Sequence, residues 1–261
     1  MLRLLFTRRW IVGAFVAVLF AVACFFLGRW QWGRHVEQRT KVAAIEHNYD
    51  ARPIPLADAL ERPLSPERQW TRVRFTGTYA VQADLLARNR PLDQTVGYEV
   101  LTPFGTDGRT VLVDRGWLPS GQAAARTPEA QAPPPGTVEV TGWLRSGEVS
   151  LGRDLPAGQL ASINIADVRR QRPEVDATDV YVVLGAQSPA VTRTSRTPLP
   201  LPRPEEGLGP HQAYAFQWWI TMPAGFVFVW WAMRRELELG SGAVPAATRP
   251  RKVRIWDEED E

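Results

Sequence analysis

One histidine stands out as a residue that could do chemistry. His211 directly precedes an apolar run at 213–233, and it shares a helical stripe with Tyr214, Ala215 and Trp218 at spacings of three, four and seven residues. An imidazole in this position can ligate a metal or titrate near neutral pH. A histidine at a membrane surface is also commonly a solvated polar residue, and the stripe alone does not separate the two readings.

A second polar strip lies just after the first apolar run. Gln31 and Arg34 fall on one face of a helix that continues past Trp30. Two helices of one chain are expected to pack together, so Trp30, Gln31 and Arg34 could face His211 and Tyr214. Imidazole, aromatic walls and a guanidinium suit the iron, ring and propionates of a heme. The competing reading is that Arg34 extends to lipid headgroups.

The sequence lacks the motifs of the common hydrolases, nucleotide-binding proteins, zinc proteases and thiol redox proteins. The sequence has no GxSxG, no phosphate-binding glycine loop, no HExxH and no CxxC, and its single cysteine, Cys24, lies in an apolar run. Its carboxylates form no recognisable acid–base pair, which leaves an extracytoplasmic hydrolase unsupported. His35 and His47 are 12 residues apart on a predicted helix, and we expect both to be solvated. A net charge of +3 is too modest to indicate nucleic-acid binding.

Two transmembrane helices are predicted to position these residues. The first spans 11–30, between Trp10 and Trp30, and the second spans 211–233, with a kink at Pro223. The alternative for the first run is a signal peptide cleaved near Cys24, but the chain remains apolar beyond that point. We therefore favour an uncleaved helix that continues above the membrane.

The arginines indicate the orientation. Basic residues precede the first run and follow the second, so residues 1–10 and 234–261 are predicted to be cytoplasmic. The tail 234–261 ends in DEEDE and is expected to be disordered. Residues 31–210 would then lie outside the cell (plasma) membrane, whose lipid surrounds both helices.

The segment between the helices is predicted to be β-rich. Alternating β-branched and aromatic residues indicate strands at 72–79, 85–88, 96–104, 110–118, 138–145, 160–165 and 180–184. Short helical turns are expected at 56–60 and 167–172. The fold class is therefore α+β: two transmembrane helices flanking an antiparallel sheet or partial barrel.

An ordered set of motifs resembles the Surfeit-locus assembly-factor family, and a bacterial, actinobacterial-like member in particular. Its blocks resemble LGxWQxxR, GxY, NR, GYxVxTP, RGWxP and NHxxYAxxW. They occur here as Leu27–Arg34, Gly77–Tyr79, Asn89–Pro91, Gly97–Pro103, Arg115–Pro119 and Pro210–Trp218. One position departs from the pattern: Pro210 stands where the family commonly has asparagine.

The resemblance implies a non-enzymatic factor for cytochrome c oxidase biogenesis that helps deliver heme a to subunit I. His211 would be the heme iron ligand, with Tyr214, Trp218, Trp30, Gln31 and Arg34 around it. Subunit I and heme a synthase are the partners that this role implies. A cofactor-free scaffold that holds nascent oxidase subunits together is the alternative.

Overall fold

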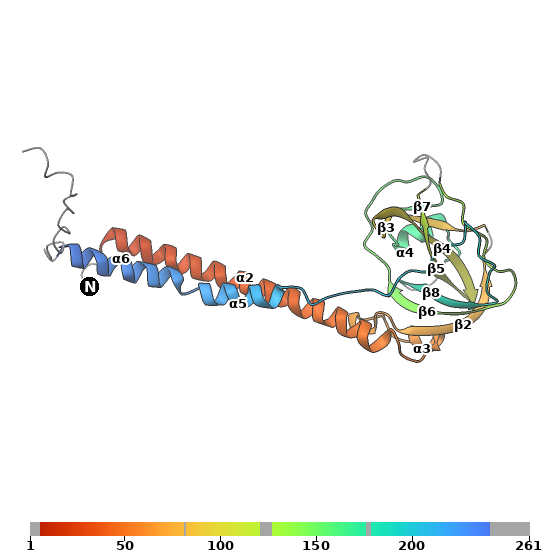
Figure 1. Ribbon diagram of the computed structural model, residues 1–261, viewed down its shortest axis with the longest axis horizontal. Coiled ribbons are helices and arrows are strands. Elements are labelled where there is room, and N and C mark those ends of the chain that lie inside the picture. Colours follow the sequence, from red (N-terminus) through yellow and green to blue (C-terminus); the bar gives the residue numbers. More distant parts are fainter. Residues whose placement is uncertain (1–5, 81, 121–126, 176–178, 241–261) are drawn as a thin grey trace, which may run out of the picture. The chain divides into compact units, whose positions relative to one another are not determined.

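A computed structural model describes residues 6–80, 82–120, 127–175 and 179–240 (Figure 1). The chain forms two compact units. One contains the residues up to Val36 together with those from Gly209 onward, and the other is Glu37–Leu208. Each unit is described by itself.

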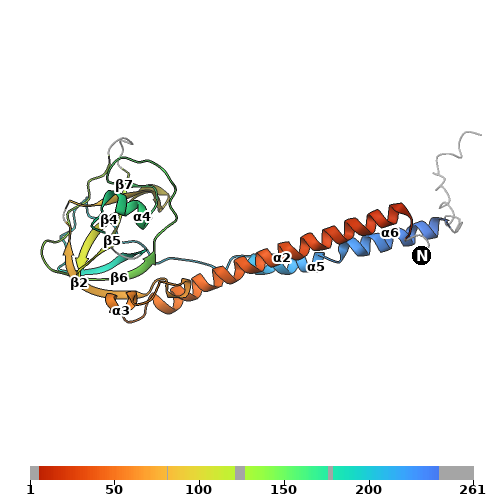
Figure 2. The same cartoon turned by 180° about the vertical axis from the view of Figure 1, so that it is seen from behind.

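The first unit is an antiparallel helix pair. Helix α2 (Arg8–Asn48) lies beside α5 (His211–Thr221) and α6 (Ala224–Gly240), as Figures 1 and 2 both show. Buried α2 residues recur every seven positions at Trp10, Ala17 and Cys24, which is the period of a packed helix face. Ala17 comes so close to Gly225 that an added Cβ at Gly225 would lie 3.3 Å from the alanine. We call the facing sides of α2 and α5–α6 the helix seam.

Helix α2 confirms the prediction that the first apolar helix continues well past the apolar run. It has 41 residues, and by length and composition it is the helix of the described chain that could cross a membrane. The second run differs from its prediction as one helix over 211–233. It is divided into α5, with 11 residues, and α6, with 17.

Pro223 explains the division. Proline has no N–H to donate to the carbonyl of Trp219, so α5 ends at Thr221 and α6 starts at Ala224. Met222 and Pro223 are turn residues between the two helices, but Met222 keeps helical dihedral angles and donates its N–H to the Trp218 carbonyl at 3.0 Å, so the interruption is as local as the predicted kink. Helix α6 continues to Gly240, so residues 234–240 are helical although they were expected to belong to a disordered tail. The rest of that tail lies outside the described residues.

The second unit is built on one eight-stranded sheet. Its long strands are β2 (Arg72–Tyr79), β3 (Leu85–Leu92), β4 (Thr95–Thr106), β5 (Arg109–Pro119), β6 (Val138–Ser146) and β8 (Val180–Ser188). Its short strands are β1 (Ile54–Pro55) and β7 (Gln159–Leu160), and its helical elements are α3 (Leu56–Leu60), η1 (Pro66–Arg68) and α4 (Ile165–Gln171). The strand expected at 160–165 is wrong beyond Leu160. There Asn164 accepts a hydrogen bond from the Asp167 N–H and caps α4.

The sheet closes into a small barrel. Its order is β1-β2-β6-β8-β5-β4-β3-β7, and an additional pairing of β2 with β4 joins five of these strands into a ring. The predicted antiparallel arrangement is only partly right, because β5 and β8 pair in parallel. Closure depends on Gly77, where an added Cβ would lie 1.9 Å from the carbonyl oxygen of Gly105.

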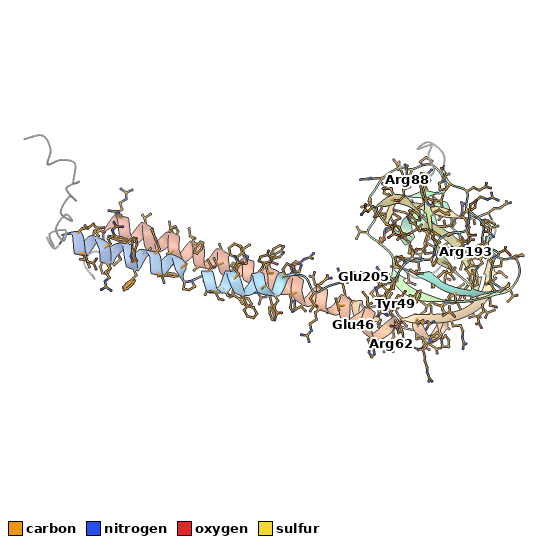
Figure 3. The ribbon with its side chains drawn as sticks, viewed as in Figure 1. Glu46, Tyr49, Arg62, Arg88, Arg193 and Glu205 are labelled. Carbon is orange, nitrogen blue, oxygen red and sulfur yellow. The ribbon has the colours of Figure 1, made fainter. Side chains whose placement is uncertain are left out.

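The barrel has an aromatic and aliphatic core. Phe104 is fully buried and makes edge-to-face contacts with Phe75 and Tyr79, at centroid distances of 5.2 and 4.7 Å. Just after α2 ends, Tyr49 stacks on Trp143 at 4.2 Å, and its carbonyl accepts a 2.9 Å hydrogen bond from the Trp143 indole. Figure 3 labels Tyr49 at this point. The barrel strand β6 is thereby joined to the end of α2.

Candidate functional site

His211 and Gln31 contact each other across the helix seam. The His211 Nδ1 atom lies 3.0 Å from Oε1 of Gln31. The glutamine oxygen can only accept, so Nδ1 carries the proton and the Nε2 lone pair stays available. Next to that edge of the ring is Gly209, where an added Cβ would lie 3.7 Å from Nε2. The contact therefore fixes the tautomer that a metal-ligating Nε2 requires.

The N-terminus of α5 shows the effect of having Pro210 where the family commonly has asparagine. Pro210 occupies the N-cap position, and no side chain caps the helix there. Its carbonyl accepts the Tyr214 N–H at 3.1 Å. An asparagine in this position could also cap α5 with its side chain. Here the helix begins at His211 without that bond, and the histidine keeps its contact with Gln31.

Aromatic rings pack against the seam next to this pair. An added Cβ at Gly28 would lie 2.2 Å from Nε1 of Trp219, so only glycine allows the indole to rest on α2 there. Trp219 and Phe216 both contact Trp32, at centroid distances of 6.0 and 6.1 Å. This explains the glycine of the LGxWQ-like block. Trp32 and Trp219 were not among the residues predicted for the site, although Trp32 lies within the Leu27–Arg34 block and Trp219 directly follows Trp218.

The other predicted site residues are more peripheral. Trp30 is 59% exposed and Tyr214 is 46% exposed, so both lie on the outside of the helix pair. Trp218 is half-buried, and Arg34 is exposed. The structure thus places Gln31 directly on His211, and it places the remaining four around the pair rather than within a closed cavity.

His35 corrects a prediction. It was expected to be solvated, but its side chain is only 6% exposed. It lies four residues after Gln31 on the same face of α2, and its ring contacts Trp32 at a centroid distance of 5.5 Å. Its Nδ1 atom is buried without a hydrogen-bond partner among the described residues. His47, the other histidine of α2, is exposed as expected.

The barrel contains a partly buried network of charges that the sequence did not reveal. Arg90 of β3 forms ion pairs with Glu99 of β4 at 3.1 Å and with Glu148 at 2.6 Å. Glu148 also accepts the Ile163 N–H at 2.9 Å. The Trp117 indole donates to the Arg90 carbonyl at 2.7 Å. Three of the motif blocks therefore meet at Arg90, and their contacts hold strands together.

The network shifts the pKa of its carboxyls in opposite directions. Burial, followed by repulsion from Glu99, raises the pKa of Asp114 well above its usual range. Burial also raises the pKa of Glu99, against the attraction of Arg90. Burial acts on Glu148 in the same direction, but hydrogen bonds from Arg90 and the Ile163 N–H outweigh it and lower the pKa of Glu148. Asp114 also accepts a 3.0 Å hydrogen bond from the Gly116 N–H, which lowers its pKa but does not offset the effect of burial.

Comparison with known proteins identifies the family. A family model described as the SURF1 family matches residues 18–222, which include the seam pair and the barrel network. The chain belongs to the SURF1 family. Uncharacterized SURF1-like proteins of Mycobacterium tuberculosis and Mycobacterium bovis are 32% identical to it over 265 residues, covering 96% of this chain and 95% of theirs. The resemblance noted from the motifs is thereby confirmed.

A more distant SURF1-family similarity is to a yeast protein. The cytochrome oxidase assembly protein SHY1 of Saccharomyces cerevisiae is 29% identical over 122 residues, covering 46% of this chain and 31% of SHY1. The match therefore concerns a part of each protein.

Proposed function

We propose that this SURF1-family protein is a non-enzymatic assembly factor for a heme a-containing cytochrome c oxidase, and that it passes heme a towards subunit I. Family membership and the name of the yeast relative support the assembly role. The contact between His211 and Gln31 is the observation that supports heme as the cargo. Heme a synthase would be the donor on the other side of the transfer.

The residues of the seam fit such a cargo. Gln31 holds the His211 ring so that Nε2 can ligate iron. Trp30 and Tyr214 expose aromatic surface that can cover one side of a macrocycle. Arg34 stands one turn after Trp30 and can pair with a propionate. A carrier must also release its cargo, and an outer surface suits transfer better than a closed pocket.

The proposal includes a place in the cell membrane. Helix α2 would cross the membrane, and α5 with α6 would form a second crossing that is interrupted at Pro223. Such an interruption is tolerated in a membrane when neighbouring groups satisfy the backbone atoms that the proline leaves unpaired. Arginines before the first apolar run and after the second support cytoplasmic termini. The barrel would then lie on the extracytoplasmic side.

The decisive experiment is spectroscopic. The full chain would be produced together with a heme a synthesis pathway, purified in mild detergent and examined by absorption. We expect a heme a spectrum that His211→Ala removes and that Gln212→Ala, at an exposed neighbouring position, leaves unchanged. Gln31→Leu should lower heme content partially, because loss of a group that orients a metal-ligating histidine typically costs 10–100-fold in affinity.

A cofactor-free scaffold is the second candidate. It is favoured by the network at Arg90, where motif residues make contacts that hold the barrel strands together. Under this hypothesis His211→Ala would support normal levels of heme a oxidase in cells, whereas Arg90→Ala would not. In the heme-carrier hypothesis both variants lower heme a oxidase and leave b-type cytochromes unaffected.

A further inference from the structure

A cavity of about 370 Å³ lies beside the barrel, between the end of β8 and the connector 189–208 that follows it. Its polar lining includes Arg115 of β5, Gln187 of β8 and Arg193 of the connector. The volume is within the range of small-ligand sites. All three residues belong to the second unit, so a ligand of this cavity is independent of the heme cargo proposed for the helix seam.

The lining of the cavity is positively charged. Among the described residues that form it are two arginines and no aspartate or glutamate. Arg193 is exposed, as its position on the outside of the barrel in Figure 3 shows, and no acid of the described chain forms an ion pair with it. An excess of positive charge in a hollow of the surface favours an anionic ligand.

Arg115 is the unusual member of the lining, because its side chain is only 3% exposed. Its Nη1 atom lies 3.5 Å from the Asp84 carboxylate, and its Nη2 atom donates to the Gln131 carbonyl at 2.6 Å. A guanidinium has five N–H groups, so three have no partner among the described residues. Burial lowers the pKa of Arg115, against the attraction of Asp84. A bound anion would supply both acceptors and counter-charge.

Gln187 adds a second donor beside Arg115. The Arg115 guanidinium lies 5.8 Å from the centroid of the Tyr79 ring, and the Tyr79 hydroxyl donates to Oε1 of Gln187 at 2.9 Å. This bond occupies the amide oxygen, so the N–H groups of Gln187 remain available to a ligand. Tyr79 thus contacts both residues and holds their donors at one end of the cavity.

The connector wall of the cavity is fixed by contacts with the barrel. Leu199 and Trp117 exchange backbone hydrogen bonds at 2.7 and 2.8 Å. Gly116 permits this approach, since an added Cβ there would lie 2.2 Å from the Leu199 carbonyl oxygen. Gln131, which accepts from Arg115, also donates to the Thr192 carbonyl at 2.9 Å. A wall held in this way is formed before a ligand binds, which lowers the entropic cost of binding.

We propose that this cavity binds a carboxylate carried on a short apolar group, with Arg115 as its main donor. A guanidinium presents a planar fork that matches a carboxylate. Phosphate fits the same fork, but Leu184, Val191 and two prolines form much of the remaining wall. Such a wall favours an apolar body over a strongly hydrated dianion. Two sources share this chemistry: a protein chain that ends in an apolar residue, and a small apolar acid.

Isothermal titration of the full chain in nanodiscs, corrected with empty nanodiscs, tests the site. The probes are 3-methylbutanoate and the uncharged 3-methylbutanamide, and the amide should bind at least about tenfold more weakly. Arg115→Lys keeps the charge and loses the fork, so it should weaken binding of the acid roughly tenfold or more. Arg193→Gln should weaken it roughly two- to fivefold, because exposed charge pairs are weak. The matched control is Arg74→Gln, at an exposed position of β2 outside the cavity, which should not differ from the wild type.

Several results would overturn the carboxylate site: no binding, equal binding of acid and amide, or equal binding of the acid and inorganic phosphate. If Arg115→Lys does not accumulate, Arg193→Gln decides, and wild-type affinity in that variant would overturn the assignment. Hydrogen exchange locates the ligand. The bound acid should slow amide exchange at 184–187 and 190–199, and slowing only in other segments would refute the location.

A peptide distinguishes the two sources. Acetyl-Ala-Val is compared as free acid and as C-terminal amide. Tighter binding of the free acid than of 3-methylbutanoate supports the end of a protein chain as the ligand, and the reverse order supports a small acid. Binding of the peptide amide as tight as that of its free acid would overturn the role of the carboxylate.

Discussion

Replacing Gly28 by alanine should loosen α5 from α2, because the indole of Trp219 occupies the space that the new methyl needs. The added carbon would lie 2.2, 2.5 and 2.8 Å from three ring atoms, whereas carbon contacts are normally about 3.5–4 Å. A rigid ring cannot absorb this by bending, so the whole side chain must move. Overpacking of this kind costs about 1–3 kcal/mol.

The control isolates that cost from the helix propensity of alanine. Gly33 is in the same helix and has no atom within 4 Å of an added Cβ. Both substitutions gain about 1 kcal/mol of helix propensity, but only Gly28→Ala introduces the clash. The two variants should therefore differ by about 1–3 kcal/mol in the local opening of α5, or roughly 5–150-fold in its amide exchange.

Hydrogen exchange of the full chain in lipid nanodiscs measures this directly. Amides of His211–Thr221 should exchange faster in Gly28→Ala than in Gly33→Ala. Truncating Trp219 to leucine in the Gly28→Ala background should recover most of the difference, because the two sites share one contact. Equal protection of α5 in both glycine variants would show that the indole does not rest on Gly28.

Two further predictions concern the barrel. Gly77→Ala should destabilise the barrel strongly, whereas Gly105→Ala on the paired strand should be tolerated, because the nearest atoms to its added Cβ lie at 3.9 Å. Urea unfolding of both variants tests this prediction, and equal unfolding midpoints would contradict it. Asp114→Asn should gain stability over the wild type as pH rises. The pKa of Asp114 is raised, so the folded form keeps its proton at pH values where the unfolded chain, with a pKa of about 3.9, has lost it; the resulting stability is fully present below the unfolded pKa and is lost as pH rises through the folded pKa. Unfolding midpoints of both proteins at pH 4, 6 and 8 measure the difference, and a gap that is independent of pH would contradict the reasoning.

Much of the barrel could be predicted because apolar and polar residues alternate along its strands and turn-forming residues such as Asp107 and Gly108 separate them. The strand β2 was predicted with its observed bounds, and the hairpin of β4 and β5 was predicted to within three residues at each strand end. Ring closure could not be read from the sequence, because it depends on two distant segments meeting at Gly77. The parallel pairing of β5 with β8 is equally non-local.

The site was predictable where it depended on a single helix face. The stripe of His211 and the strip of Gln31 were both visible from spacing, and the structure brings these two residues together. His35 was misjudged because it was compared with His47 rather than with the seam stripe. The Arg90 network was missed for a different reason: its carboxylates come from separate segments, Glu99 through the pairing of β3 with β4 and Glu148 from the segment that follows β6.

Free-energy considerations separate the polar residues of the seam from those of the barrel. The Arg90 network is partly buried with its charges paired, so removal of one partner would leave a partly desolvated charge without its counter-ion, and the network is accounted for by the contacts between strands. The seam is different. A hydrogen bond contributes only about 0.5–1.5 kcal/mol net, so the bond between His211 and Gln31 stabilises the seam modestly, while the unpaired His35 nitrogen costs about 1–3 kcal/mol. Elsewhere the same seam is closed by small residues such as Ala17 and Gly225, but it also buries the Trp10 indole nitrogen without a hydrogen-bond partner among the described residues.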